Sequence, residues 1–360
     1  MKFMFCVQGE GRGHMTQAIA LQNLILKHGH ELVAVVVGKS ERREIPTFFH
    51  QQIKTEVVAL ESPNFVTHKD NKSINITATI VQNLKKFSHY WKNVRKLHFI
   101  VAKQKPDVII NFYEFLCGVY ISTHRPQVRH ICIGHQFLLE HPEFVFPENL
   151  GKRDRFWYFV NTAISAPKFE KKLALSFRKI EDNQPKKICV VPPLLRAEVL
   201  ELKPSQGDYV LMYVVNAGFS DDIIEWHKNN THVKIHLFTD RKDIADETVF
   251  HQTLTVHKLN DKKFLTLMKD CKAYASTAGF ESICEAMYLG KPVLLVPPRG
   301  HFEQQCNALD AVLSGAGITS NFFDLDTFLK YIDTHSNDKK ETFKTWVDGA
   351  EAYFSRHLFQ

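Results

Sequence analysis

Short apolar runs alternate with amphipathic helical patterns along almost the whole chain, and this alternation restricts the fold more than any other feature. Residues 2–8 and 31–37 are typical of buried strands, and the stripe of Ala18, Leu21 and Leu24 predicts a helix between them over 16–28. Strands that are joined by helices run parallel in one sheet, so the alternation predicts an α/β fold with helices on the faces of mostly parallel sheets.

The alternation is interrupted once, by a proline-rich stretch over 192–206, and it resumes with a new apolar run over 209–215. At 360 residues the chain is long enough for two domains. We therefore expect a first Rossmann-like domain over 1–192, a second over 207–338, and a C-terminal helix over 339–360 that packs back across the junction. Ligands of such sheets bind at the carboxyl ends of the strands, which predicts a cleft between the domains. Further strands are expected at 107–112, 127–133, 233–239, 253–257, 273–276 and 293–296.

The composition narrows the setting of the protein. Its seven cysteines are odd in number and never spaced as C-x-x-C, which disfavours a disulfide framework and a zinc site and favours a reducing cytoplasm. No apolar run approaches the roughly 18 residues that a membrane span needs. The net charge of +7 favours an anionic partner. Nucleic acid is not expected, because neither a dense basic run nor an aromatic-basic RNA motif is present.

Residues 74–103 predict one long amphipathic helix with a basic face that includes Lys85, Lys92 and Arg95. Two interpretations remain open. The helix can dock peripherally on an anionic membrane, at the inner face of the cell membrane, where it would meet a lipid-linked acceptor. Alternatively, its basic face is simply solvated above a buried apolar stripe.

The loop after the first strand, Gly9-Glu10-Gly11-Arg12-Gly13-His14, has alternating glycines that let the backbone approach a ligand. The helix that follows offers free amides to an anion, so we expect Gly11 and Gly13 to lie at a phosphate. A dinucleotide-binding fingerprint would need glycine where His14 stands, which disfavours an NAD-dependent oxidoreductase. His14 itself can be a general base or a packing histidine.

A second glycine-containing turn follows the strand over 273–276. The small residues Thr277 and Ala278 precede Gly279 and a helix, which is again an arrangement that binds anions. Glu281 and Glu285 lie four residues apart, so they share one face of that helix. The only D-x-D motif is Asp324-Leu325-Asp326, at a predicted helix start where aspartate is a common cap. This disfavours an enzyme whose D-x-D motif binds a metal ion, and no metal is expected.

The block from Gly279 through Glu285, Gly290-Lys291-Pro292 and Pro297 to Glu303-Gln304-Gln305-Cys306-Asn307-Ala308 resembles the donor-binding signature of GT-B glycosyltransferases. The first loop is similar to the glycine–histidine turn of the same superfamily. The chain looks most similar to the group that contains the peptidoglycan N-acetylglucosaminyltransferase and the UDP-glycosyltransferases. The resemblance implies the GT-B fold, in which two Rossmann-like domains face each other across a cleft.

The resemblance also implies roles for individual residues. Glu285 would bind the ribose of the donor, and Glu303 and Gln304 would bind the transferred sugar. His14 would be the general base, and Glu114 is a loose match for the acid that orients it. The remaining donor-binding residues that we expect are Gly11, Gly13, Asn216, Gly218, His257, Thr277, Ala278, Gly279, Phe280, Glu281 and Asn307.

We therefore expect an inverting, metal-independent hexosyltransferase. The donor would be a nucleotide diphosphate sugar, and a UDP-sugar is the first candidate. The sugar would move to a hydroxyl group of an acceptor, which is a glycan such as a cell-envelope glycan, a lipid-linked molecule or a small molecule. It needs no cofactor besides the nucleotide sugar as co-substrate. Two alternatives remain open: a non-hydrolysing sugar-nucleotide 2-epimerase of the same fold, and a non-catalytic subunit that binds a sugar nucleotide.

Overall fold

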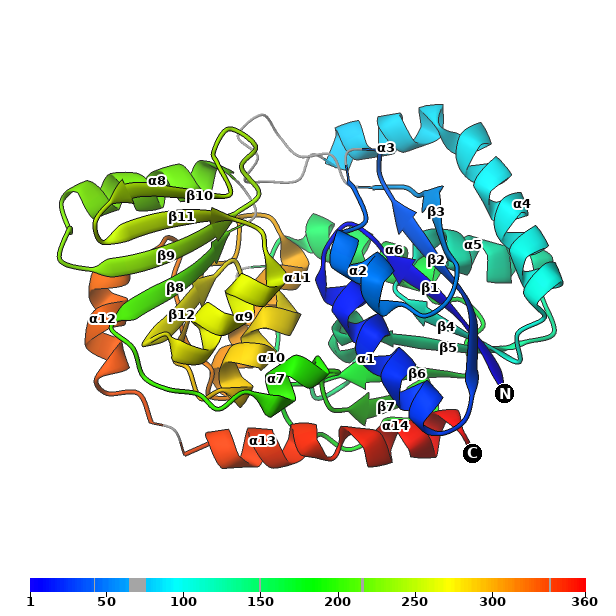
Figure 1. The fold of residues 1–360 in the computed structure, drawn as a ribbon. Helices are drawn as coiled ribbons and strands as arrows, with labels where there is room; N and C mark the ends of the chain where they lie inside the picture. Colours follow the sequence, from blue (N-terminus) through cyan, green and yellow to red (C-terminus); the bar gives the residue numbers. More distant parts are fainter. Residues whose placement is uncertain (42, 65–75, 149, 215–216, 337) are drawn as a thin grey trace.

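Two parallel α/β sheets stand side by side in the protein (Figure 1). The computed structural model describes residues 1–41, 43–64, 76–148, 150–214, 217–336 and 338–360. We refer to residues 1–191, which contain the first sheet, as the first half, and to residues 209–332, which contain the second sheet, as the second half. The observed architecture confirms the predicted fold class.

The first sheet has seven parallel strands in the order β3-β2-β1-β4-β5-β6-β7. Phe3 to Val7 of β1 are fully buried, as expected for a central strand that helices cover on both faces. The strands are β1 (Lys2–Gln8), β2 (Glu31–Lys39), β3 (Val57–Glu61), β4 (Val108–Phe112), β5 (Arg129–Gly134), β6 (Lys171–Leu175) and β7 (Ile188–Val191). The helices of this half are α1 (Gly13–Lys27), α2 (Thr47–Gln52), α3 (Ile76–Lys85), α4 (Phe87–Gln104), α5 (Phe115–His124) and α6 (Lys152–Ser165), with the 3₁₀ helices η1 (His135–Glu140) and η2 (Gln184–Lys186).

The second sheet also has seven strands, in the order β10-β11-β9-β8-β12-β13-β14, of which β10 alone runs antiparallel to its neighbour. The strands are β8 (Tyr209–Val214), β9 (Lys234–Thr239), β10 (Glu247–His251), β11 (Leu254–Lys258), β12 (Ala273–Ser276), β13 (Val293–Leu295) and β14 (Gly317–Thr319). The helices of this half are α8 (Ala217–Lys228), α9 (Asp261–Asp270), α10 (Phe280–Tyr288), α11 (Phe302–Leu313) and α12 (Leu325–Ile332).

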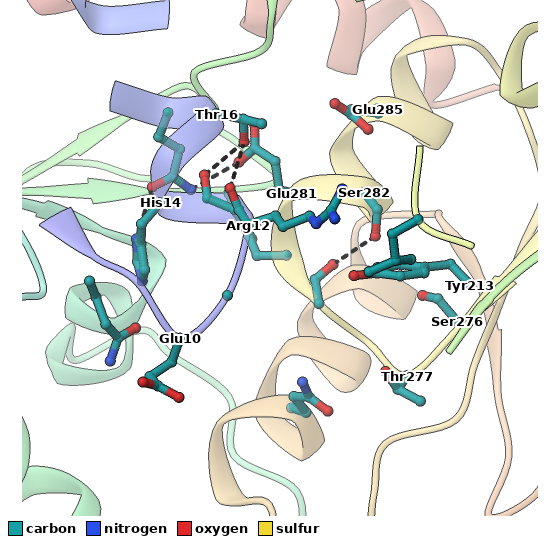
Figure 2. Close-up of a pocket in the computed structure, with 18 of the residues that line it drawn as sticks. Glu10, Arg12, His14, Thr16, Tyr213, Ser276, Thr277, Glu281, Ser282 and Glu285 are labelled. Atoms are coloured by element: carbon teal, nitrogen blue, oxygen red, sulfur yellow. Dashed lines mark hydrogen bonds between the residues drawn. The ribbon is translucent and has the colours of Figure 1, made fainter. Parts of the chain in front are cut away.

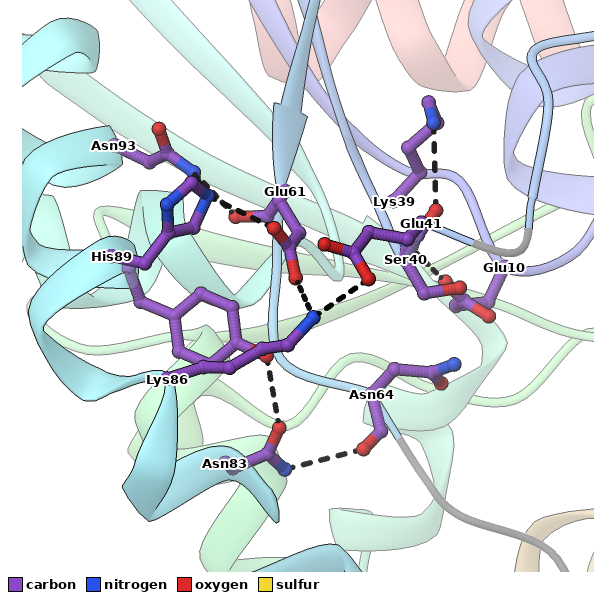
Figure 3. A network of polar contacts seen from close by, with 11 residues as sticks. Glu10, Lys39, Ser40, Glu41, Glu61, Asn64, Asn83, Lys86, His89 and Asn93 are labelled. Atoms are coloured by element: carbon purple, nitrogen blue, oxygen red, sulfur yellow. Dashed lines mark hydrogen bonds and ion pairs between the residues drawn. The ribbon is translucent and has the colours of Figure 1, made fainter.

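The predicted single helix over 74–103 is two helices, α3 and α4, with a break at Lys86; residues 74 and 75 lie outside the described residues. At the break, the ammonium group of Lys86 lies 2.6 Å from Glu61 and 3.0 Å from Glu41 (Figure 3). The expected buried stripe is also incomplete, because Phe87 is 63% exposed. Among the described residues, we find no helix whose length and hydropathy would let it cross a membrane.

The proline-rich stretch between the halves is packed rather than loose. It contains α7 (Ala197–Glu201), and the side chains of Leu194, Leu195 and Arg196 are buried. This segment is therefore packed against the rest of the protein, and its residues can contribute to a site between the two sheets.

The C-terminal segment is also two helices instead of one. α13 (Lys340–Asp348) and α14 (Ala350–Leu358) are separated at Gly349 and run beneath both halves (Figure 1). α13 packs against α10 of the second half, and α14 packs against β7 of the first. The indole nitrogen of Trp346 donates a hydrogen bond of 2.9 Å to the carbonyl of Ser176, which ties α13 to the first half as well.

Candidate functional site

A cavity of about 420 Å³ lies between the two halves, a volume within the range of small-molecule sites. Its lining comes from the loop between β1 and α1, from the loop between β12 and α10, from the start of α11 and from the linker. Figure 2 shows His14 and Glu10 on the side of the first half, with Tyr213 and Thr277 opposite them. The carboxyl ends of strands from both sheets thus meet at one place, as the fold predicts.

The first glycine loop is held against β2 at its beginning and left open at its middle. The amide of Gly9 donates to the carbonyl of Gly38 at 2.7 Å, and a Cβ at Gly9 would lie only 2.7 Å from Cγ1 of Val37. A Cβ at Gly11 would meet no atom within 4 Å. Gly11 and Gly13 both line the cavity, so the backbone there is accessible to a ligand.

His14 lines the cavity with a side chain that is only 8% exposed. Its Nδ1 lies 3.1 Å from Oε1 of Gln17, and its Nε2 lies 3.3 Å from Nε2 of Gln136. Burial lowers the pKa of His14 to about 4, although the hydrogen bond to Gln17 acts in the opposite direction. The imidazole is therefore neutral at pH 7 and has a lone pair with which it can accept a proton.

Glu114 does not act as the acid partner of His14 in this structure, contrary to the sequence interpretation. Its carboxylate caps α5 by accepting a hydrogen bond of 2.7 Å from the amide of Cys117, and its other oxygen accepts one of 2.7 Å from Ser62. Glu114 is fully buried and is not part of the cavity lining. Its role is to cap a helix behind the site.

The loop between β12 and α10 presents backbone amides to the cavity. Thr277 and Gly279 line it, Gly279 is the N-cap of α10, and no side chain caps this helix start. Among the described residues, no atom lies within 4 Å of a Cβ built at Gly279, so a ligand can approach this backbone closely. The geometry is that of an anion site at a helix N-terminus.

Ala278 and Asn307 shape this loop and do not line the cavity, which corrects their predicted contact with the donor. Ala278 is buried and has a φ of 61°, in the left-handed region that alanine rarely adopts. Nδ2 of Asn307 donates a hydrogen bond of 3.2 Å to the carbonyl of Ala278. Asn307 thereby stabilises the turn that presents Gly279.

The two glutamates of α10 are buried and have different partners. Glu285 pairs with Arg196 of the linker, whose Nε lies 2.7 Å from Oε1 of Glu285. Burial raises the pKa of Glu285, and the Arg196 charge opposes that shift. Glu281 instead reaches across the cleft and accepts a hydrogen bond of 2.9 Å from Nε2 of Gln17. Burial, together with the charge of Glu285, raises the pKa of Glu281 to about 8.

Glu303 and Gln304 line the cavity from the first turn of α11. Glu303 accepts a hydrogen bond of 2.9 Å from Nε2 of Gln136, and its enclosure raises its pKa to about 7. Among the described residues, Oε1 of Gln304 and Oε1 of Glu281 are buried without a hydrogen-bond partner. Buried polar atoms normally have partners, so both oxygens are available to polar groups of a ligand.

Several other predicted donor-binding residues lie elsewhere. Phe280 borders the cavity, but its ring stacks on His135 of the first half at a centroid distance of 4.2 Å. His257 is buried, its Nε2 lies 2.9 Å from Nδ1 of His236, and it does not line the cavity. Gly218 lies in the first turn of α8 and is not part of the lining either, while Asn216 lies outside the described residues.

Some lining residues were not anticipated. Arg12 stands between two of the loop glycines, and Figure 2 shows it extending toward Ser282 at the start of α10. Its place in the glycine loop was a signal that could have identified it. Arg196 and Gln136 lie in the linker and in η1, and their sequence neighbourhoods contain no motif that would have marked them. Other unanticipated residues of the lining include Gln17, Tyr213, Phe238, Leu259, Asn260 and Phe264.

Comparison with known proteins assigns the family. Residues 1–333 match the sequence model of a family described as glycosyl transferase family 1. The chain belongs to this family. It is a nucleotide-sugar-dependent glycosyltransferase with the GT-B fold, which confirms the resemblance drawn from the Gly279–Ala308 block. Membership favours a transferase over the 2-epimerase and over the non-catalytic subunit.

Two curated relatives of this glycosyltransferase align over most of its length. An uncharacterized glycosyltransferase of Methanosarcina mazei is 24% identical over 343 residues, covering 88% of this chain and 85% of its own. The UDP-N-acetylglucosamine–N-acetylmuramyl-(pentapeptide) pyrophosphoryl-undecaprenol N-acetylglucosamine transferase of Fusobacterium nucleatum is 24% identical over 326 residues, covering 82% and 78% of the two chains.

Solved structures show the same fold at lower identity. The glycotransferase of kitacinnamycin superposes with a TM-score of 0.63 at 14% identity and covers 98% of this chain and 95% of its own. Arabidopsis thaliana UGT89C1 complexed with UDP-L-rhamnose superposes with a TM-score of 0.59 at 14% identity, covering 97% and 94%.

Proposed function

We propose that this glycosyltransferase moves a hexosyl group from a UDP-sugar to an acceptor hydroxyl, with inversion at the anomeric carbon and without a metal ion. The observation that carries the proposal is the arrangement of the cleft. A neutral, buried histidine forms one wall, and the amide-rich start of α10 faces the same cavity from the other half. UDP is the proposed nucleotide because UDP-sugars appear in the names of two relatives, the Fusobacterium enzyme and the Arabidopsis complex.

The donor would occupy the cavity from the second sheet toward the first. Tyr213, Phe238 and Phe264 give an aromatic wall for the base. The carboxylate of Glu285 would accept hydrogen bonds from the ribose hydroxyls. The diphosphate would lie at the amides of Gly279 and the start of α10, which supply preorganised positive potential. Arg12 would add a cation from the first half, in place of a metal ion. Glu303 and Gln304 would bind hydroxyls of the transferred sugar, Gln304 through its unpartnered Oε1.

The reaction then needs one proton transfer and one displacement. Nε2 of His14 accepts the proton of the acceptor hydroxyl while the acceptor oxygen forms a bond to the anomeric carbon. The bond between that carbon and the diphosphate oxygen breaks on the opposite face, and its electron pair stays on the departing nucleotide. A positioned base contributes about 10²–10⁴-fold to such a step.

We also propose that residues 1–192 form the acceptor-binding domain and residues 207–338 the donor-binding domain, with 339–360 packing across their junction. The acceptor would be a glycan such as a cell-envelope glycan, a lipid-linked molecule or a small molecule. All seven cysteines are buried free thiols, which fits a reducing cytoplasm. Exposed Leu84, Phe87 and Phe99 stand beside basic residues of α3 and α4, which fits peripheral contact with an anionic membrane.

A thermal-shift screen followed by kinetics tests the proposal. UDP and UDP-sugars are expected to raise the melting temperature more than GDP, TDP or CDP compounds, since a ligand at 100 times its Kd stabilises the native state by about 2.7 kcal/mol. Gly279→Val should abolish this shift, because a Cβ at this position meets no described atom of the free protein within 4 Å, whereas the side chain would occupy the place of a diphosphate at the backbone. His14→Ala should keep the shift and lower UDP release at least about a hundredfold.

The exposed His232→Ala serves as the matched control and should change neither measurement. If no nucleotide raises the melting temperature, the donor site is wrong. If His14→Ala turns over at the wild-type rate, His14 is not the base.

A further inference from the structure

Two glutamine amides hold the ring of His14, and each amide is anchored on a carboxylate of the second half. On the Nδ1 side, Gln17 places its Oε1 3.1 Å from the ring nitrogen and donates through Nε2 to Glu281 at 2.9 Å. On the Nε2 side, the Nε2 of Gln136 lies 3.3 Å from the ring nitrogen and also donates to Glu303 at 2.9 Å. These contacts join residues that are 264, 122 and 167 positions apart in the chain.

The orientation of each amide follows from its anchor. The NH₂ group of Gln17 donates to Oε2 of Glu281, and a protonated carboxyl group keeps this acceptor when its proton is on Oε1, so the carbonyl of Gln17 faces His14 in either state. A carbonyl can only accept, which means that Nδ1 of His14 carries the proton. The NH₂ group of Gln136 faces Glu303 in the same way and offers its second hydrogen to Nε2 of His14. Nε2 must then have the lone pair, so both sides assign the same tautomer.

We propose that Gln17 and Glu281 are positioning residues, which fix His14 as the Nδ1–H tautomer and aim the lone pair of Nε2 at the acceptor hydroxyl. This inference rests on the proposed role of His14 as the general base. The resemblance to GT-B glycosyltransferases implies an acid close to the histidine as the orienting group. Here a neutral amide contacts the ring, and the carboxyl group stands one residue further away, on the helix that presents its N-terminus to the donor.

A single acid next to the histidine would both set its tautomer and stabilise the positive charge that forms on the ring. Here the Gln17 amide sets the tautomer, and Glu281 stabilises the charge through that amide. The Gln17 carbonyl sets the tautomer by accepting from Nδ1–H, and no proton leaves Nδ1 during the reaction. When Nε2 accepts the acceptor proton, the new positive charge polarises the amide toward Glu281. The Gln136 amide occupies the place at Nε2 that an acceptor hydroxyl must take, and its second contact, with Glu303, gives it a position to which it can withdraw.

Glu281 belongs to α10, so the base is oriented by the half that binds the donor. The contact requires the two halves to be close, and they are close here: a Cβ at Gly13 would lie 3.4 Å from Cβ of Glu281, in van der Waals contact. A separated arrangement of the halves would leave Gln17 without its anchor and its amide free to rotate. The tautomer of His14 is therefore set only when the halves are docked.

The ring nitrogens of His14 provide the direct test. In the full-length chain labelled with ¹⁵N-histidine, the two-bond ¹H–¹⁵N correlations that disappear in His14→Ala belong to His14. In the wild type, Nδ1 should have the chemical shift of a protonated nitrogen and Nε2 that of an unprotonated one. In a Gln136→Leu background, which lacks the hydrogen bond to Nε2, Gln17→Leu should mix or reverse the tautomers. The double exchange Gln17→Glu with Glu281→Gln keeps a carbonyl-type acceptor at Nδ1 and should retain Nδ1–H.

UDP release gives the catalytic readout, with the UDP-sugar that raises the melting temperature most. Gln17→Leu should lower kcat about 10- to 100-fold, within the contribution of a positioned base, while the donor KM stays within about twofold. The double exchange should recover most of that loss, whereas Gln17→Glu alone should not, because it removes the NH₂ group that donates to Glu281 and places a second carboxyl group beside it. Gln82→Leu, at an exposed glutamine of α3, is the matched control.

The outcomes distinguish this inference from the proposed function. A wild-type spectrum with the proton on Nε2, or a tautomer that Gln17→Leu leaves unchanged in the Gln136→Leu background, overturns the role of Gln17 even if His14→Ala is inactive. A double exchange no better than Gln17→Leu overturns the role of Glu281. If His14→Ala is fully active, the proposed base is wrong, whatever the tautomer.

Discussion

The ion pair between Arg196 and Glu285 links the packed segment between the halves to the part of the cleft in which we propose that the ribose binds. The two side chains are 9% and 2% exposed, and Nε of Arg196 lies 2.7 Å from Oε1 of Glu285. Arg196→Met removes the cation and keeps most of the apolar stem, which leaves a buried carboxyl group without its partner. Breaking a buried pair in this way costs about 3–5 kcal/mol of stability.

The size of the effect on melting follows from the chain length. An unfolding entropy of about 2.1 cal/mol/K per residue gives about 0.76 kcal/mol/K for a chain of this length that melts in one transition. Arg196→Met should therefore lower the melting temperature by about 4–7 °C. UDP should also bind at least about tenfold more weakly, because an unpaired Glu285 has a still higher pKa and loses acceptor capacity toward the ribose.

A second variant separates stability from binding. Arg196→Met combined with Glu285→Leu replaces both charges by apolar groups, a change that is often neutral or stabilising for a buried pair. Its melting temperature should return close to that of the wild type, while calorimetric titration should still find weak UDP binding. Arg129→Met is the control, since its pair with Glu170 is about one-third exposed and such pairs contribute about 1 kcal/mol or less.

Two results would refute this reasoning. An unchanged melting temperature for Arg196→Met would mean that the pair does not stabilise the buried carboxylate. Wild-type UDP affinity in the double variant would mean that Glu285 does not bind the ribose.

Two further predictions concern pH and membranes. A general base must be neutral before it can accept a proton, and burial lowers the pKa of His14 to about 4. We therefore expect kcat/KM for UDP release to be nearly the same at pH 6 as at pH 7. An ordinary histidine of pKa 6.5 would be only about one-quarter neutral at pH 6. A pH–rate profile with an acid limb centred near 6.5 would contradict this. The protein should co-sediment with vesicles that contain phosphatidylserine but not with neutral vesicles. The double variant Phe87→Ser, Phe99→Ser should reduce the fraction of protein that is bound. Equal sedimentation with both vesicle types would exclude α3 and α4 as a surface that binds anionic membranes.

Much of the fold follows from local patterns. β1 and β2 are continuous apolar runs, because helices cover both faces of a parallel sheet, and the sequence alone predicts them. β6 was missed because it begins with Lys171 and Lys172, yet Lys172 is buried and pairs with Glu140 at 2.5 Å. β14 has only three residues and depends on pairing with β13. Tertiary contacts create these strands, and a local pattern cannot indicate them.

The candidate site also contains residues that local motifs predict and residues that only the tertiary structure brings together. Gly279, Glu285, Glu303 and His14 line the cavity where the motifs of their own loops placed them. The partners of these residues come from distant segments that no motif marks, as with Arg196, which is 89 positions from Glu285. Glu114 failed as the partner of His14 for a related reason. It follows β4 as the family pattern requires, but its carboxylate turns to the start of its own helix.

The course of the chain has a mechanical consequence. The chain passes from the first half to the second through the segment that contains α7. It returns at Gly349, between α13 and α14. Both crossings lie along the same edge of the molecule (Figure 1). Two covalent connections on one edge define a hinge axis, and rotation about that axis is the relative motion that strains neither of them. The cleft would then open like a clamshell on the far edge, so substrates would enter and products would leave there.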